Sequence, residues 1–280
     1  MQKVAIALVH GVGEQTDDTN ILLERDLIEQ TEALCGKDAV VFKVVFWAPV
    51  VRASAELLYK QLSESRHLNF LPIRRYLVNY LGDVLAYQII EGERGVYDAI
   101  HSIFADTLNK LAEEAGPRAP LIIVAHSLGT IITSNYFYDL QKDQMMRVSR
   151  AVRSMMGESP LERGETLTSL YTFGSPLPIW SLGVKDFGMP MKVPAPLLRH
   201  HHPKLEGEWI NFYDADDVLG YPLKSLNAAY NAEVKEDRQV NIGKWYESWN
   251  PLSHLGYWRD KDATHPVAEG IHKVWQTINL

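Results

Sequence analysis

Residues 121–132 constrain the fold of this chain more than any other segment. They begin with four apolar, mostly β-branched residues, continue with Ala125-His126-Ser127-Leu128-Gly129 and end in a second apolar run. A short run of this kind is typical of a strand buried on both faces of a sheet. The segment therefore predicts a buried strand, a sharp turn at Ser127 and then a helix.

The small residues around Ser127 indicate the chemistry of this turn. Ala125 and Gly129 stand two positions before and after the serine. In a nucleophile elbow the strand and the helix nearly touch, so both positions must be small, and the strained turn lifts the hydroxyl above the sheet. Ala125 takes the place of the more usual glycine. The backbone N–H of Leu128, at the start of the helix, would then point at a developing oxyanion.

A second candidate for that oxyanion hole lies near the start of the chain. Residues 4–9 are almost continuously apolar and run into His10-Gly11-Val12-Gly13. A glycine here allows a tight turn, so that the N–H of Val12 would be the second donor. The alternative is a phosphate-binding glycine turn, which would require a third glycine that this loop lacks.

The remaining strand signals alternate with helical ones. Strands are predicted at residues 40–47, 168–173 and 209–213, and a crossover helix at 95–115. This alternation predicts an α/β fold over residues 1–280, with a mostly parallel sheet and helices on both faces. Residues 52–93 are helical in period and exceed what a crossover needs. They predict a helical insertion that caps the site, or a helix whose apolar residues simply pack on the sheet.

Acidic side chains follow the strand predicted at residues 209–213. Asp214, Asp216 and Asp217 stand at its C-terminal end, where the acid of a Ser-acid-His constellation belongs. Helix capping and a solvated turn are the other roles open to them. All three therefore stay candidates at this point.

A base is required as well, because serine is a poor nucleophile at its own pKa. Of the ten histidines, only His254, His265 and His272 follow the acidic cluster. The last two belong to the terminal amphipathic helix, which is predicted to start at Pro266 or Val267. His254 lies in a loop with aromatic residues behind it, so we take it as the base.

The run His200-His201-His202 has no role in this scheme. Adjacent residues of an extended chain point to opposite faces and cannot all bind one ion. We expect a surface loop there, and neither a metal nor another cofactor in this protein.

Composition limits the partners and the compartment. The net charge of −7 does not favour binding to nucleic acid. The lone cysteine, Cys35, fits a reducing compartment. The apolar N-terminus is too short for a signal peptide and no window approaches a membrane span. We expect a cytoplasmic protein.

At these residues the chain resembles the α/β-hydrolase fold family, and within it the lipase- and esterase-like serine hydrolases. The resemblance rests on five segments: His10-Gly11-Val12-Gly13, Ala125-His126-Ser127-Leu128-Gly129, Gly174-Ser175-Pro176, Asp216-Asp217-Val218 and His254-Leu255-Gly256-Tyr257-Trp258. The last is similar to the segment around the catalytic histidine of triacylglycerol lipases.

The resemblance implies a catalytic triad of Ser127, Asp217 and His254 and an oxyanion hole from Val12 and Leu128. It favours Asp217, which precedes a valine as the acid often does in lipase-like sequences, and leaves Asp216 as the alternative acid. The implied activity is hydrolysis of a carboxylic ester through an acyl-enzyme, with a small ester or acyl compound as substrate. A thioesterase or amidase would use the same triad, and a non-catalytic module that binds lipids or proteins is the alternative of another class.

Overall fold

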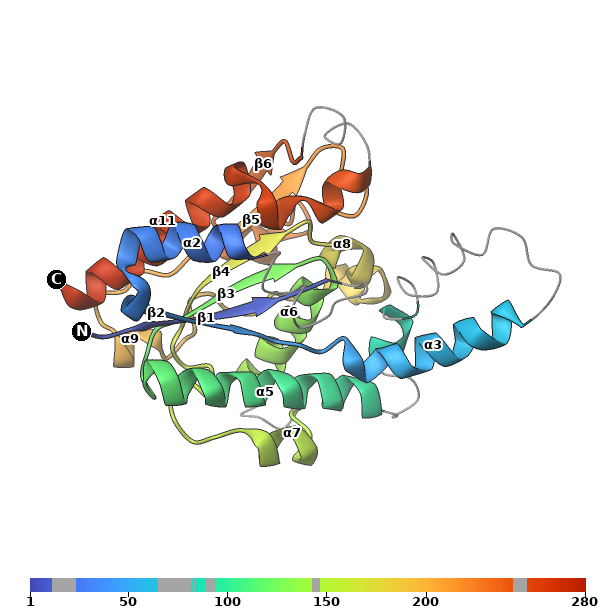
Figure 1. Ribbon diagram of the computed structural model, residues 1–280, viewed down its shortest axis with the longest axis horizontal. Coiled ribbons are helices and arrows are strands. Elements are labelled where there is room, and N and C mark those ends of the chain that lie inside the picture. Colours follow the sequence, from blue (N-terminus) through green and yellow to red (C-terminus); the bar gives the residue numbers. More distant parts are fainter. Residues whose placement is uncertain (12–23, 65–81, 83, 89–93, 143–146, 244–250) are drawn as a thin grey trace.

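A six-stranded sheet forms the centre of the computed structural model, which describes residues 1–11, 24–64, 82, 84–88, 94–142, 147–243 and 251–280 (Figure 1). All neighbouring strands are parallel, in the order β2-β1-β3-β4-β5-β6. The strands are β1 (Val4–Val9), β2 (Val40–Val44), β3 (Leu121–His126), β4 (Leu167–Phe173), β5 (Trp209–Asp214) and β6 (Glu236–Val240). Because parallel neighbours cannot be joined by a hairpin, each connection crosses a face of the sheet.

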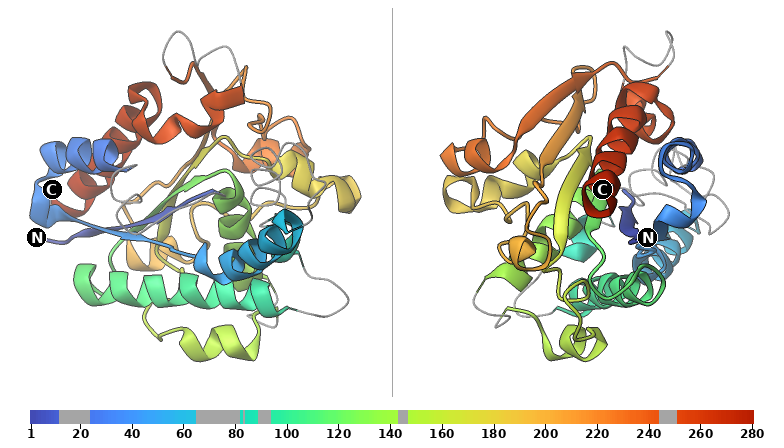
Figure 2. Two further views of the ribbon diagram at one scale, coloured as in Figure 1. Left: turned by 45° about the vertical axis from the view of Figure 1, so that its right-hand side comes forward. Right: turned by 90° about the vertical axis from the view of Figure 1, so that its left-hand side faces the viewer.

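Helices cover both faces of this sheet, as the two views of Figure 2 show. On one face lie α2 (Arg25–Cys35) and α11 (Lys261–Asn279), which pack against each other; on the other lie α5 (Gly95–Ala115) and α6 (Leu128–Gln141). The shorter helices are α7 (Arg150–Met155), α8 (Leu177–Trp180), α9 (Leu198–His201) and α10 (Ala228–Glu233). The predicted α/β fold with helices on both faces is confirmed, and its sheet is parallel throughout.

Strand β1 shows how the sequence divides between the two layers. Its residues are all buried, because both faces of the strand are covered. Ala5 and Ala7 point into the core beneath α5 and α6, whereas Ile6 and Leu8 point into the core beneath α2 and α11. This alternation is the two-residue period of a strand, and it explains why the segment reads as continuously apolar.

The final helix begins earlier than the sequence pattern predicts. It starts at Lys261, and the Asp260 side chain caps it by accepting a hydrogen bond from the N–H of Asp262 at 2.9 Å. Pro266 therefore lies within the helix and does not mark its start. Residues 233–242 contain β6, which lies at the edge of the sheet and pairs in parallel with β5.

The three-histidine segment is also different from the expected surface loop. His200 and His201 end the short helix α9, and His201 pairs with Glu165 at 2.9 Å. His202 is buried and bonds the carbonyl oxygen of Arg118 at 2.7 Å. Tertiary packing, which a local pattern does not report, gives His201 and His202 separate partners.

Most of the predicted insertion at residues 52–93 lies outside the described residues. Its first part belongs to α3 (Pro49–Ser63), which extends away from the sheet in Figure 1. Leu57 and Leu58 on this helix are exposed. The capping role of the segment therefore stays a prediction. No described helix has the length and apolar character needed to span a membrane.

Candidate active site

Ser127 occupies a strained turn between β3 and α6. Its φ and ψ of 52° and −126° lie in a region that residues with a side chain seldom adopt. The turn works because its neighbours are small. A methyl group on Gly129 would collide with the carbonyl oxygens of Val9 and His10, and a Cβ on Gly11 would lie 2.6 Å from the Cβ of Ser127. The elbow geometry predicted from the spacing is therefore present.

The serine meets a histidine from the far end of the chain. The Ser127 Oγ lies 2.8 Å from Nε2 of His254, which stands in the short 3-10 helix Pro251–Leu255. On the other side of the ring, Nδ1 lies 3.0 and 2.9 Å from the two carboxylate oxygens of Asp217. All three side chains are buried. The structure thus brings Ser127, His254 and Asp217 into one hydrogen-bonded line.

Asp217 is held in its ionised form by the donors around it. Burial alone would raise the pKa of this carboxyl group, but hydrogen bonds from His254, Leu219 and Tyr257 outweigh burial and lower the pKa below its ordinary value. The N–H of Leu219 donates to Oδ1 and the hydroxyl of Tyr257 donates to Oδ2, each at 2.9 Å. With an ionised Asp217, the Nδ1 of His254 carries a proton and its Nε2 is free to accept one.

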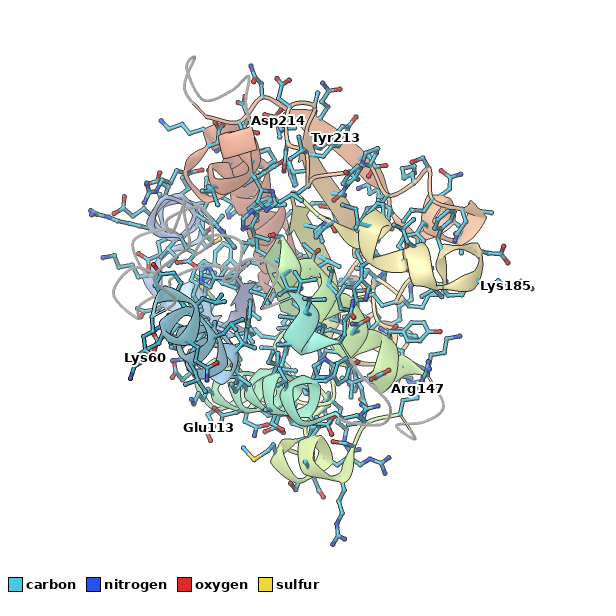
Figure 3. The ribbon with its side chains drawn as sticks, turned by 90° about the vertical axis from the view of Figure 1, so that its right-hand side faces the viewer. Lys60, Glu113, Arg147, Lys185, Tyr213 and Asp214 are labelled. Carbon is cyan, nitrogen blue, oxygen red and sulfur yellow. The ribbon has the colours of Figure 1, made fainter. Side chains whose placement is uncertain are left out.

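The other two aspartates have different roles. Asp216 is exposed, and its backbone N–H donates to Oδ1 of Asp214 at 2.7 Å. The other oxygen of Asp214 accepts the N–H of Ile242 at 2.5 Å, which ties β5 to the chain after β6. Figure 3 looks onto the edge where the strands end, and Asp214 is labelled at the end of β5. Asp214 therefore stabilises the turn after β5 as a buried side chain, and not in the solvated turn considered for these acids.

Tyr257 lies in the segment around His254 on which the resemblance rests, but the sequence assigns it no role at the site. It is fully buried, and besides donating to Asp217 its hydroxyl accepts the backbone N–H of Asp214 at 2.9 Å. Its position three residues after His254 was the available signal, because one helical turn places it beside the same acid.

His126 also contacts the catalytic line. Its Nε2 lies 2.7 Å from the backbone carbonyl oxygen of His254, and the two ring centroids are 4.8 Å apart. Burial, aided by the nearby His254, lowers the pKa of His126 to about 3. The ring is therefore neutral at physiological pH, and its Nε2–H donates to the carbonyl. The residue just before the nucleophile thus fixes the backbone of the base.

Of the two predicted oxyanion donors, Leu128 lies among the described residues and Val12 does not. Leu128 is the first residue of α6, so its N–H has no acceptor four residues earlier in the helix. Val12 lies outside the described residues, and its role stays a prediction. Its neighbour Gly11 is described and packs directly against Ser127.

A buried pair stands beside this loop. The Nε2 of His10 lies 2.5 Å from Oε1 of Glu24, and both side chains are about 1% exposed or less. The His10 ring also packs against Trp258, at 5.6 Å between centroids. This pair brings together the residue before Gly11 and the residue before α2, and no local sequence pattern indicates it. Among the described residues, no three His, Cys, Asp or Glu side chains are grouped to hold a metal ion.

No family model matches the sequence, and no curated protein matches it. Among solved structures, the chain is similar to XC6422 from Xanthomonas campestris, described as an α/β serine hydrolase without lid, at 8% identity and a TM-score of 0.38, over 97% of this chain and 81% of that one. It is also similar to a structure from work on the metagenome-derived lipolytic enzymes LipS and LipT, at 10% identity and a TM-score of 0.40, over 97% and 94%. A third similar structure is Est1E from Butyrivibrio proteoclasticus, at 10% identity and a TM-score of 0.35, over 100% of this chain and 90% of that one. The parallel sheet, the crossover helices and the elbow after β3 are those of an α/β-hydrolase fold.

Proposed function

We propose that this protein is a serine hydrolase that cleaves carboxylic esters through an acyl-enzyme. The observation that carries the proposal is the contact of 2.8 Å between the Ser127 hydroxyl and His254, backed by Asp217. A nucleophile, a base and an acid that orients the base are the three parts that acyl transfer by serine requires. Here they are buried together at the end of the sheet.

Each residue has one role in the proposed reaction. Ser127 Oγ attacks the ester carbonyl carbon, and its proton passes to Nε2 of His254. As the tetrahedral intermediate collapses, His254 returns that proton to the departing alkoxide and the alcohol leaves. Water then attacks the acyl-enzyme with His254 again as base, releasing the acid and restoring the serine. Asp217 keeps the Nδ1 proton in place and stabilises the imidazolium formed in each half-reaction.

The charge on the carbonyl oxygen also needs donors. The N–H of Leu128 at the start of α6 is suited to this, and the N–H of Val12 is the proposed second donor. Removing one such donor typically costs about 10² to 10³ in kcat, so the hole contributes substantially to the rate.

The contact between Ser127 and His254 argues against the main alternative, a non-catalytic binding module. A non-catalytic binding module would not need its serine within hydrogen-bond distance of a buried histidine that an acid orients. The same triad would serve a thioesterase or an amidase, so ester cleavage is to be tested beside both. An apolar substrate is proposed because residues 52–93, which are predicted to cap the site, are rich in large apolar side chains.

The test is turnover of p-nitrophenyl esters, with matched thioesters and anilides. We expect ester hydrolysis with a burst of p-nitrophenol equal to the enzyme concentration, and a loss of roughly 10³ to 10⁶ in kcat for Ser127→Ala. The control is Ser154→Ala, an exposed serine of α7 that should leave turnover unchanged. Equal turnover by Ser127→Ala and the control would overturn the proposal.

A further inference from the structure

A cleft of about 600 Å³ opens along one side of α6, the helix that follows Ser127. Its two walls differ in character. One wall is polar and includes Ser134, Asn135 and Asp139 of α6. A second wall is formed by lining residues between positions 177 and 189 and is mainly apolar, with Leu177, Trp180, Val184, Phe187 and Met189. A cleft with one polar and one apolar wall suits an amphiphilic ligand.

The near end of the cleft is tied to the triad by a short piece of chain. Gly174 packs against the triad, since a Cβ there would lie 2.8 Å from Asp217 Oδ2 and 3.1 Å from His254 Nδ1. Three residues later, Leu177 lines the cleft. Three residues of chain span at most about 11 Å. Leu177 therefore lies within about 11 Å of Gly174, which places this end of the cleft near the triad.

The far end carries two arginines. Arg94 and Arg147 both face Asp139, with nitrogen-to-oxygen distances of 3.8 and 3.9 Å, which exceed a hydrogen bond. Asp139 instead accepts the hydroxyl of Tyr97 at 2.9 Å, and burial raises the pKa of this carboxyl group despite its three neighbours. Arg94 also donates to Asp98 at 3.1 Å and to the backbone carbonyl oxygen of Arg147 at 3.3 Å. Each guanidinium has five N–H donors, so capacity is left for a further acceptor.

Among the described residues, the charged groups of the cleft lining are two arginines and one aspartate. Asp98, which is not a lining residue, pairs with Arg94 at 3.1 Å, whereas Arg147 has no described carboxylate within hydrogen-bond distance. The half-exposed Arg147 guanidinium is therefore the group best placed to hold an anion.

We propose that the cleft binds the anionic end of an ester whose body is apolar, with Arg94 and Arg147 holding a carboxylate or phosphate group. The proposal rests on the proposed ester hydrolysis and names the substrate class. Asp139 lies 12 residues after Ser127 on the same helix, which is about 18 Å along the axis. At the ~1.2 Å per bond of an extended chain, the anion stands roughly 15 bonds from the scissile carbonyl.

The test compares two substrates that differ only at the far end. One is the mono-p-nitrophenyl ester of hexadecanedioic acid, and the other is the same compound with its free carboxylate methylated, both below their critical micelle concentrations. We expect kcat/KM to favour the free acid by about tenfold or more, the value of a charge-assisted hydrogen bond. The preference should fall as salt is raised, because Arg147 is half exposed.

Three variants sharpen the comparison. Arg147→Gln should abolish the preference and Arg147→Lys should keep part of it, since lysine retains the charge without the planar fork. The matched control is Arg150→Gln, an exposed arginine at the start of α7 that lies outside the cleft lining and should keep the full preference. A wild-type enzyme that cleaves both substrates equally would overturn the cleft proposal and leave the ester hydrolysis standing.

A binding measurement separates the two proposals. Hexadecanedioate is titrated calorimetrically into Ser127→Ala and into Ser127→Ala/Arg147→Gln. Binding that weakens about tenfold in the double variant supports the cleft, even if no ester is hydrolysed and the proposed function fails. Binding that is absent, or equal in the two proteins, overturns the assignment of this cleft to an anion.

Discussion

Replacing Tyr257 with phenylalanine tests how the acid of the site is held. The hydroxyl donates to Asp217 Oδ2 and accepts the N–H of Asp214, both at 2.9 Å, in a fully buried position. Its removal deprives a carboxylate of one hydrogen bond, worth ~1.5–3 kcal/mol, and strands a buried N–H at a cost of ~1–3 kcal/mol. Since neighbouring groups relax, we expect a net loss of roughly 3 kcal/mol in the free energy of unfolding. At ~2–4 °C per kcal/mol, the melting temperature should fall by about 6–12 °C.

The same change should alter the pH dependence of stability. Burial raises the pKa of Asp217, but the hydrogen bonds that the carboxylate accepts lower this pKa by more. The resulting pKa lies below the ordinary value. A lowered folded-state pKa stabilises the protein above the unfolded pKa, and this contribution is lost as pH falls through the folded pKa. Without the tyrosine hydroxyl the pKa rises, so the variant should lose stability at a higher pH than the wild type. Acid unfolding followed by circular dichroism checks this shift.

Tyr171→Phe provides the matched control. Tyr171 is also fully buried and donates to a carboxylate, that of Glu208, at 2.9 Å, but it lies on β4 away from the triad. We expect the control to lower the melting temperature while keeping kcat for a p-nitrophenyl ester. Tyr257→Phe should lower kcat by about tenfold in addition, or ~1.4 kcal/mol. Equal kcat values in the two variants would refute the role given to Tyr257.

Two further substitutions and one alkylation experiment have expected outcomes. Gly129→Ala should prevent the elbow from forming, because a Cβ at this position would collide with backbone atoms. It should lower expression or the melting temperature by more than the control Gly183→Ala, where a Cβ would meet no atom within 4 Å. Glu24→Gln should cost ~1–3 kcal/mol of unfolding free energy, because a neutral amide replaces the carboxylate in a buried contact with His10, and an unchanged urea midpoint would argue against that pairing. Cys35 should resist iodoacetamide at pH 8 until urea is added, since burial raises its thiol pKa to about 11, and rapid alkylation of the native protein would contradict this.

The sequence predicts the parts of this fold that depend on local pattern. Doubly buried strands read as apolar runs, so residues 4–9 and 121–126 are recognisable from their side chains alone. Ser127 is identified because its turn demands small neighbours at fixed spacing. His254 follows from chain order, since it alone among the histidines after the acids lies outside the terminal helix.

What the sequence could not predict depends on contacts between distant segments. Nothing near Glu24 indicates that it lies against His10, because the pairing is made by the packing of α2 on the sheet. The cleft is equally hidden, since Arg94, Arg147 and Trp180 come from three separate segments. The sequence pattern misplaces the start of α11 because Pro266 resembles a helix start, although the cap at Asp260 sets the boundary.

Labelling with a fluorophosphonate, followed by peptide mass spectrometry, shows whether Ser127 is an activated nucleophile. We expect one adduct per chain, located on Ser127, and loss of labelling in both Ser127→Ala and His254→Ala, because only a serine deprotonated by its histidine attacks the phosphorus. An adduct on another residue, or undiminished labelling of His254→Ala, would refute the proposed catalytic role of Ser127 and His254.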